Sequence, residues 1–464
     1  METSDTDNLF LKGSLPLVFL KTAAPIILMM LVNGSFSLVD AYFLGIFVGA
    51  EALTAVTSMF PAFMLIVALT TLVSSGFSSV MARQLGAGEN SKAVETFSQA
   101  MTLALLVCGV LIGLFLLGGS QFTSSVSNGS ETLSQMSYTY ISILIFFSPL
   151  GFILAINGDS LRCEGKIPFM AFISLVSVLL NGVFNYILIV KMNWGVAGSA
   201  YGTVLAQLAS IIAAYIYRRV KTDKLNIQVL SFSGGRKHWQ EFLALGAPSS
   251  LTYVGLALSS AAILYNLQVW SQANYEVTVG AYGIITRLMA FIFLPLLGLS
   301  MAFQTITGNN VGANESERAN TSIKIALVTS FIYCVILQII TLLFRNDFGR
   351  IFVSDANIVS EVGRILPIST GGLFLLGPLM IVSMFFQSIG DAKRASILGL
   401  TKIYCFALPL TFMLPFVFSE WGIWIAAPST EALGLLLTLY ILNKRRQQQG
   451  NPFGLFFKND AMVQ

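Results

Sequence analysis

One carboxyl group lies inside a long apolar stretch near the start of the chain. The stretch runs from about Leu15 to Gly45 and contains Asp40. An acid within a membrane-spanning helix costs roughly 3 kcal/mol on insertion scales, so it is usually turned inward, paired or protonated. Helical spacing places Asn33, Ser37 and Asp40 near one face. This polar stripe is a candidate ion or ligand site; the alternative is that Asp40 caps the helix at the headgroup level.

The composition is that of a membrane protein. Of 464 residues, 55% are hydrophobic and only 10% are charged, and the mean hydropathy is +0.77. These values exclude an ordinary soluble domain. A transmembrane helix needs about 20 apolar residues, and about twelve runs of this kind follow one another along the chain. The predicted fold class is an all-α polytopic membrane protein with about twelve transmembrane helices.

The basic residues are unevenly distributed between the two sides of these predicted spans. Of the 26 Lys and Arg residues, twenty lie on the side of the two termini. The opposite side holds only four, and two lie within spans: Lys191, Arg345, Arg350 and Arg364, then Arg287 and Lys402. The positive-inside rule then places both termini in the cytoplasm. We expect an integral protein of a bacterial inner (plasma) membrane.

The two halves of the chain repeat each other. Three motifs recur after 223 to 226 positions: Ala24-Pro25 as Ala247-Pro248, Gly86-Ala87 as Gly312-Ala313, and Gly165 as Gly390. An even number of spans per half gives both halves the same orientation. We therefore predict two six-helix lobes around a central cleft. The predicted domains are an N-terminal lobe (1–217), a cytoplasmic linker (218–240), a C-terminal lobe (241–446) and a cytoplasmic tail (447–464).

Five motifs carry a resemblance to a known family: Ala24-Pro25-Ile26, Asp40 with Phe43-Leu44-Gly45, Arg83-Gln84-Leu85-Gly86-Ala87-Gly88, Arg162-Cys163-Glu164-Gly165-Lys166-Ile167-Pro168 and Gly195-Val196-Ala197-Gly198-Ser199-Ala200. They resemble the multidrug and toxic compound extrusion (MATE) transporters, and within them the bacterial DinF-like branch. The resemblance implies a secondary antiporter that exports organic cations or amphiphilic drugs. Export would be driven by protons, or by sodium, through alternating access.

The resemblance also implies a polar cluster that binds the coupling cation. The residues that match it are Asp40, Asn157, Asn181, Asn185 and Thr203. That branch often has a second aspartate at the position of Asn185, and a single carboxylate attracts sodium less strongly. A sodium site at Asp40, Asn181, Asn185 and Thr203 is therefore one of two alternatives, the other being proton binding alone. We expect no other metal and no cofactor. The alternative for the two asparagines is that their amides only hold helices together.

Other polar residues within spans have competing interpretations. Asn33, Ser37, Arg287 and Glu431 are candidates for the substrate cleft, although Arg287 could instead extend to the interface or pair with a carbonyl. We expect Lys402 to reach the membrane interface with its long side chain. Pro25 removes a backbone hydrogen bond and is the candidate conformational hinge.

Two rival functions remain. A flippase for a lipid-linked or amphiphilic intermediate would favour a more basic cavity than Arg287 alone supplies. A membrane-embedded enzyme is disfavoured because the sequence shows no catalytic constellation, and a missing Walker sequence excludes an ATP-driven pump. We expect a monomer whose partners are small organic cations or amphiphiles and membrane lipid, with no nucleic acid.

Overall fold

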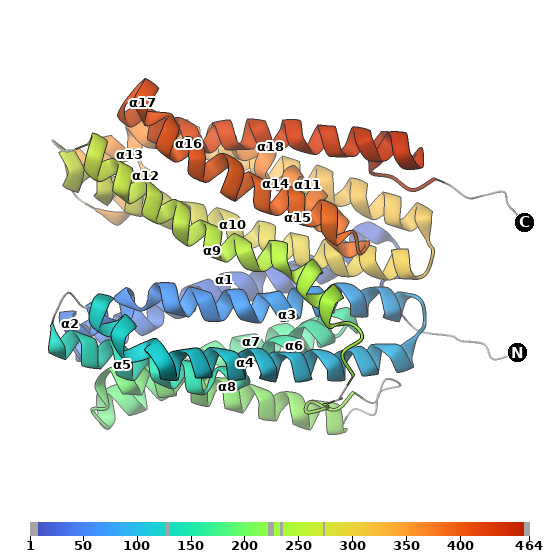
Figure 1. Cartoon of the computed structure of the whole chain (residues 1–464), viewed down its shortest axis with the longest axis horizontal. Coiled ribbons are helices and arrows are strands. Elements are labelled where there is room, and N and C mark those ends of the chain that lie inside the picture. The colour runs from blue at the N-terminus through green and yellow to red at the C-terminus, as the bar shows by residue number, and fades with distance from the viewer. Residues whose placement is uncertain are drawn as a thin grey trace, which may run out of the picture. The chain divides into compact units, whose positions relative to one another are not determined.

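The computed structural model describes residues 8–126, 130–220, 227–232, 235–271, 274–353 and 355–458. Within these ranges, the side chains of residues 33, 35–39, 41, 50 and 276 are not described. Every regular element in the described ranges is a helix (Figure 1). The all-α prediction is confirmed.

Two kinds of membrane span occur in the described part of the chain. Ten helices are each long and apolar enough to cross a bilayer. Two further spans are bent pairs: α5 (Glu131–Phe146) with α6 (Ser148–Cys163), at 47°, and α13 (Ala356–Ser369) with α14 (Leu373–Ser388), at 50°. If each pair counts as one span, the total is twelve, as the sequence predicts.

The chain divides into two compact units, and neither coincides with a single continuous segment. The first comprises Met1–Leu9 and Ala24–Tyr253, and the second comprises Phe10–Ala23 and Val254–Gln464. Two helices are therefore shared between the units. The helix α1 (Leu15–Phe47) passes from the second unit to the first between Ala23 and Ala24, next to Pro25.

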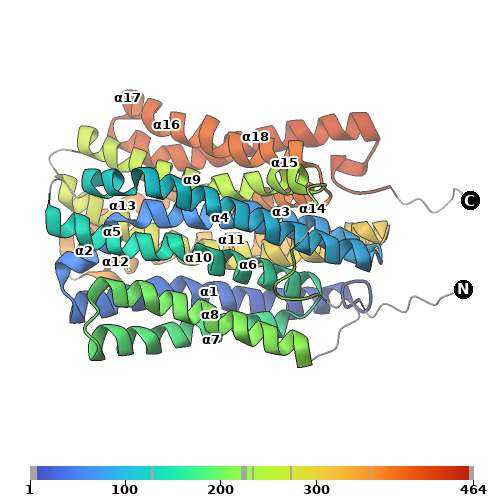
Figure 2. The same cartoon turned by 60° about the horizontal axis from the view of Figure 1, so that its bottom comes forward.

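The first unit contains most of α1 and seven further α-helices among the described residues. These are α2 (Ala50–Ser58), α3 (Phe60–Gly86), α4 (Asn90–Val126), α5, α6, α7 (Ile167–Asn185) and α8 (Gly195–Val220), with a π-helical segment, η1 (Tyr186–Lys191), between the last two. Its core is formed by apolar side chains such as Met59, Leu111, Ile141 and Ala200. In Figure 2, α7 and α8 run side by side next to α1.

The second unit contains Phe10–Ala23, and its longer segment begins within α9 (Trp239–Trp270), which contains Pro248 and leaves the first unit after Tyr253. Its other elements are α10 (Tyr275–Gly312), α11 (Ser316–Leu343), α12 (Phe348–Phe352), α13, α14, α15 (Ala392–Leu400), η3 (Thr401–Ala407), α16 (Leu408–Met413), α17 (Pro415–Phe418), α18 (Glu420–Gln449) and η4 (Pro452–Gly454). Leu267, Ile284, Leu366 and Trp424 pack in its core.

The internal repeat is visible in the two bent spans. The pair that begins at Glu131 and ends at Cys163 is matched, 225 positions later, by the pair that begins at Ala356 and ends at Ser388. Both halves thus interrupt their fourth span at the same place. Interrupted helices in transporters expose backbone groups near the membrane midplane, where binding sites form.

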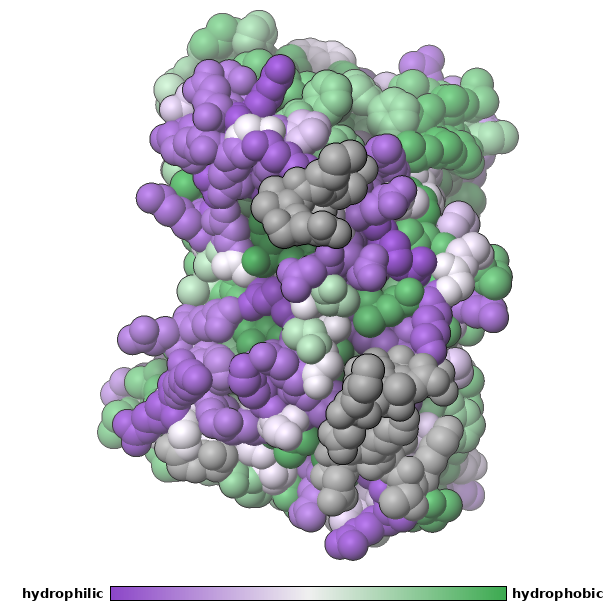
Figure 3. Space-filling view, turned by 90° about the vertical axis from the view of Figure 1, so that its right-hand side faces the viewer, coloured by the Kyte–Doolittle hydropathy of each residue, from purple (hydrophilic) through white to green (hydrophobic). Residues whose placement is uncertain are grey.

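The helix ends carry the polar residues. Figure 3 shows the face that includes the turns between α3 and α4 and between α10 and α11, and hydrophilic side chains cover much of it. This distribution is expected for segments outside the hydrocarbon layer, because only there can water solvate charged groups.

Candidate functional site

Asp40 lies at one end of a polar network that joins three helices of the first unit. Only 8% of the residue is exposed. Its Oδ1 accepts a hydrogen bond from Asn185 Nδ2, and the same nitrogen donates to Asn181 Oδ1 at 3.2 Å. Asn181 Nδ2 then donates to Thr203 Oγ1 at 3.3 Å. The network therefore connects α1, α7 and α8, and it contains four of the five predicted cation-coupling residues.

The local sequence explains how these groups meet. Asn181 and Asn185 lie one turn apart on α7, so their amides face the same side of the helix. The π-helical segment η1 begins immediately after Asn185, and such segments occur frequently at functional sites. On the facing helix, Gly202 leaves the space that Asn185 occupies: a Cβ there would lie 2.2 Å from Asn185 Oδ1.

The sequence reasoning missed Gly202 and named Gly198 only as part of a family motif. A Cβ at Gly198 would lie 3.0 Å from Ile189 Cγ1 and 3.2 Å from the Leu188 carbonyl carbon. The two glycines are four positions apart, which is the small-xxx-small spacing that lets membrane helices approach closely. That spacing was present in the sequence and could have identified the α7–α8 contact.

The network contains an unused acceptor. Asn185 Oδ1 is buried and has no hydrogen-bond partner among the described residues. Hard cations such as sodium bind oxygen atoms of carboxylates, amides and hydroxyls. This free oxygen, the Asp40 carboxylate and Thr203 Oγ1 are donors of that kind. The described residues hold no group of three or more His, Cys, Asp or Glu that could bind a metal.

Asn157 does not join the network. It is 1% exposed, and its Nδ2 donates to the carbonyl oxygens of Ile153 at 2.9 Å and Val229 at 3.2 Å. The second acceptor belongs to the segment 227–232, which lies between α8 and α9 in the first unit. Asn157 therefore holds this segment against α6, and among the described residues no hydrogen bond connects it to Asp40.

The tentative cleft residues have different surroundings. The side chains of Asn33 and Ser37 lie outside the described residues. Arg287 is exposed on α10. Glu431, on α18, forms an ion pair with Lys402: Oε1 and Nζ are 2.8 Å apart. The expectation that Lys402 reaches the membrane interface is wrong, because its ammonium group is held by this carboxylate within unit two.

A second charged cluster of the first unit lies at the turn between α6 and α7. Glu164 is buried and accepts hydrogen bonds from Arg218 at 2.9 Å, Lys166 at 2.6 Å and Ser160 at 2.6 Å. Burial alone would raise the pKa of Glu164, but the positive charges of Arg218 and Lys166, with these hydrogen bonds, lower the pKa below its ordinary value. The cluster joins the end of α8 to the α6–α7 turn.

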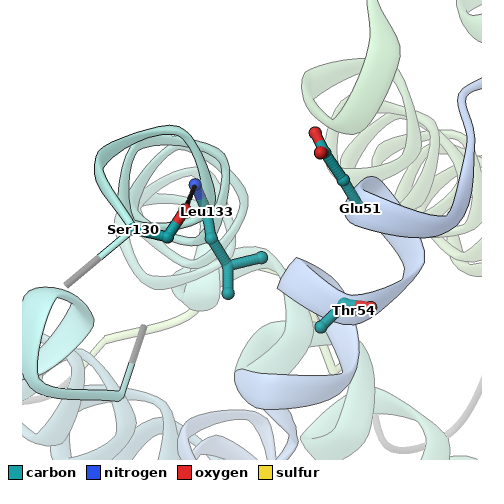
Figure 4. Close-up of a pocket in the computed structure, with 4 residues that line it drawn as sticks. All are labelled: Glu51, Thr54, Ser130 and Leu133. Carbon is teal, nitrogen blue, oxygen red and sulfur yellow. Dashed lines mark hydrogen bonds between the residues drawn. The ribbon is translucent and has the colours of Figure 1, made fainter. Parts of the chain in front are cut away.

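An open pocket of the first unit lies apart from Asp40. Glu51 and Thr54 of α2 face Ser130 and Leu133 at the start of α5 (Figure 4). Ser130 caps α5 by accepting a hydrogen bond from Leu133 N at 3.3 Å. None of the residues of the Asp40 network lines this pocket.

The fold and the buried acid define a polytopic membrane transporter. The MatE family model matches residues 25–187 and 248–413, one segment in each half, and the chain belongs to this family. The family consists of transporters and not of enzymes. The two matched segments each begin at the proline of an Ala-Pro pair, Pro25 and Pro248.

Similar proteins support the assignment along the whole chain. The "Probable multidrug resistance protein YoeA" of Bacillus subtilis is 25% identical over 459 residues, which cover 94% of this chain and 96% of that protein. The "Multidrug export protein MepA" of Staphylococcus aureus is 24% identical over 427 residues, covering 91% and 92%. A solved outward-facing multidrug resistance MATE transporter of the MOP superfamily has a TM-score of 0.85 at 22% identity, covering 96% of this chain and 98% of that chain.

Proposed function

We propose that the protein is a secondary antiporter that exports organic cations and other amphiphilic drugs in exchange for protons, or for sodium, by alternating access. The observation that carries the proposal is the buried Asp40 carboxyl, bridged to α7 and α8 within membrane-spanning helices. The relatives whose names include multidrug resistance or multidrug export support drugs as the substrate class.

The hydrogen bonds suggest how a proton changes the network. An ionised carboxylate only accepts hydrogen bonds, whereas a protonated one must also donate. Asp40 now accepts from Asn185 Nδ2. A proton on Asp40 could be donated to the unused Asn185 Oδ1 if the amide turned over. That turn would remove the bond from Asn185 to Asn181, so protonation of Asp40 on α1 would alter the packing of α7 against α8.

The choice of ion follows from the number of carboxylates. Asn185 stands where the DinF-like branch, which this sequence resembles, often has a second aspartate. Sodium would therefore meet one negative charge and the neutral oxygens of Asn181, Asn185 and Thr203. We infer that a proton is the principal coupling ion and that sodium, if it binds, uses these same oxygens.

The proposed domain organisation is the one predicted from the sequence: 1–217, 218–240, 241–446 and 447–464. Alternating access requires the two units to move. Two helices, α1 and α9, pass from one unit to the other, and each contains the proline of an Ala-Pro pair. Pro25 is one residue from the point where α1 changes unit. A proline inside a helix removes a hydrogen bond and permits a kink, which supports Pro25 as a hinge.

We further propose that both termini are cytoplasmic, in a bacterial inner membrane, and that the protein is a monomer. The turn at Glu89 and the turn at Asp347 then lie on opposite sides. A cysteine placed at Asp347 should react with an impermeant maleimide in intact cells, and one at Glu89 only after permeabilisation. The reverse pattern would overturn the orientation.

Substitution of Asp40 tests the proposed coupling. Asp40→Asn keeps the size of the side chain but cannot exchange a proton, so the purified variant in vesicles should lose proton-gradient-driven efflux and remain folded. Asp347→Asn, the same change at an exposed position, is the control and should transport normally. Near-parental efflux by Asp40→Asn at equal protein content would move the coupling role elsewhere, with Glu431 as the next candidate.

A further inference from the structure

The second unit contains a charged pair in the middle of its last membrane span. Glu431 lies 11 residues after Glu420 and 14 before Arg445, so it is about 17 Å and 21 Å along α18 from these positions at 1.5 Å per residue. Its partner, Lys402, lies on the π-helical segment η3. Ionisable groups at this depth are costly and usually functional.

The pair is located at the interruption of the tenth span. Gly372 is the residue before α14, and a Cβ there would lie 2.9 Å from Glu431 Cβ. One turn along α18, a Cβ at Gly434 would lie 3.8 Å from Lys402 Cδ. Glycine thus allows the backbone of α14 to approach Glu431. The side chains of Lys402 and Glu431 remain 22% and 15% exposed, so the pair is not sealed within the unit.

The pair leaves hydrogen-bonding capacity of both signs unused. Glu431 Oε1 contacts Lys402, but the buried Oε2 has no hydrogen-bond partner among the described residues. A lysine ammonium has three donors, and the ion pair with Glu431 is the single polar contact that the described part of the chain gives to Lys402. One acceptor and at least one donor therefore lie side by side.

The charges of such a pair select among ligands. A simple cation that approaches Glu431 Oε2 is repelled by Lys402, and a simple anion that approaches Lys402 is repelled by Glu431. A molecule with both charges is attracted by both groups: its N–H donors can bond Oε2, and its carboxylate can accept from Lys402. It also leaves no buried charge without a partner, which is the expensive outcome for either simple ion.

We propose that Lys402 and Glu431 form a recognition site for zwitterionic amphiphiles, distinct from the Asp40 network. The proposal rests on the proposed export function, whose substrate class it narrows. Displacement of the Lys402 ammonium from Glu431 would free the carboxylate for a ligand, and the four-carbon stem of lysine permits that movement. Glu431 and Lys402 then act as binding residues, and Asp40 acts as the coupling acid for zwitterionic and cationic substrates alike.

Two dyes that differ in one group provide the test. Rhodamine 110 carries a free carboxylate beside its cationic, N–H-bearing ring system, whereas rhodamine 123 is its methyl ester and purely cationic. Binding to the purified full-length protein in detergent is measured by fluorescence anisotropy. The parent should bind rhodamine 110 at least about tenfold more tightly than rhodamine 123, because the ester leaves Lys402 without an acceptor. Equal affinities would overturn the proposal.

The neutral double variant Lys402→Gln with Glu431→Gln removes both charges. Its preference for rhodamine 110 should fall to within about threefold of unity, with binding of rhodamine 123 retained. The matched control is Asp347→Asn with Arg350→Gln, which removes an exposed ion pair of the same unit (3.2 Å) and should keep the parental preference. A preference for rhodamine 110 that persists in the neutral variant, or an equal loss of affinity for both dyes, would show that the pair is structural.

A charge-swapped variant provides a second test if the neutral double variant folds poorly. Lys402→Glu with Glu431→Lys keeps an ion pair but reverses its polarity relative to α14, and it should also lose the preference. Parental discrimination by the swapped protein would refute the site. Vesicle efflux of the two dyes separates this inference from the export function: a parent that binds rhodamine 110 selectively but exports neither dye contradicts the export proposal alone.

Discussion

Replacement of Gly202 by alanine tests whether Asn185 must occupy its present position. The new methyl carbon would lie 2.2 Å from Asn185 Oδ1 and 3.2 Å from Asn185 Cγ. Carbon and oxygen atoms in contact need about 3.3 Å, so the amide must retreat by about 1 Å. The bond from Asn185 to Asn181 is already 3.2 Å long and does not survive such a shift, since hydrogen bonds beyond about 3.5 Å are not effective.

Two terms set the size of the effect. Overpacking a well-filled contact costs about 1–3 kcal/mol, and loss of a hydrogen bond between neutral groups, such as that from Asn185 to Asn181, costs about 0.5–1.5 kcal/mol. Gly202→Ala should therefore lower the melting temperature in detergent and reduce proton-driven efflux by at least about tenfold, because 1.4 kcal/mol corresponds to that factor. The control is Gly158→Ala, where the nearest neighbouring atom, Met170 Cγ, is 4.0 Å from the added carbon.

A second substitution separates the clash from the lost function. In the Gly202→Ala background, Asn185→Ala removes the side chain that the methyl group strikes. The double variant should regain the stability of Asn185→Ala alone, yet efflux should stay low because the bridge to Asp40 is absent. Residues in contact show such non-additivity. Strictly additive losses of stability, or parental efflux by Gly202→Ala, would refute the role assigned to Asn185.

Three further changes have defined outcomes. Asn185→Asp should increase the sodium dependence of efflux, because a second carboxylate strengthens cation binding; an unchanged sodium response would contradict the assigned cluster. Pro25→Ala should slow turnover in vesicles more than it lowers membrane abundance, and unchanged turnover would remove the hinge role. Glu164→Gln should cost roughly 3–5 kcal/mol at pH 7, because it leaves Arg218 buried without its partner. The pKa of Glu164 is lowered in the folded protein, so the carboxylate stabilises the fold above its ordinary pKa near 4.5, and this stabilisation disappears as the pH falls below that value. The melting temperatures of parent and variant should therefore converge in acid. A difference that stays constant with pH would contradict this reasoning.

The sequence alone was sufficient for the fold class and for much of the candidate site. Hydropathy counted about twelve spans because a bilayer demands about 20 apolar residues per helix. The cost of an acid in hydrocarbon singled out Asp40, and the spacing of Asn181 and Asn185 put their amides on one face. The repeated Ala-Pro pairs likewise indicated two related halves.

Other features depended on how helices far apart in the sequence pack. Asn157 bonds to Val229, 72 positions away, and Lys402 bonds to Glu431 instead of extending to the interface. The close approach at Gly202 and the bend within each fourth span were also not predicted. Periodicity determines which face of a helix is polar, but not which neighbour that face meets. The partner is chosen by side-chain volume, backbone approach at glycine and the need to satisfy every buried polar group, and these are properties of the packed structure.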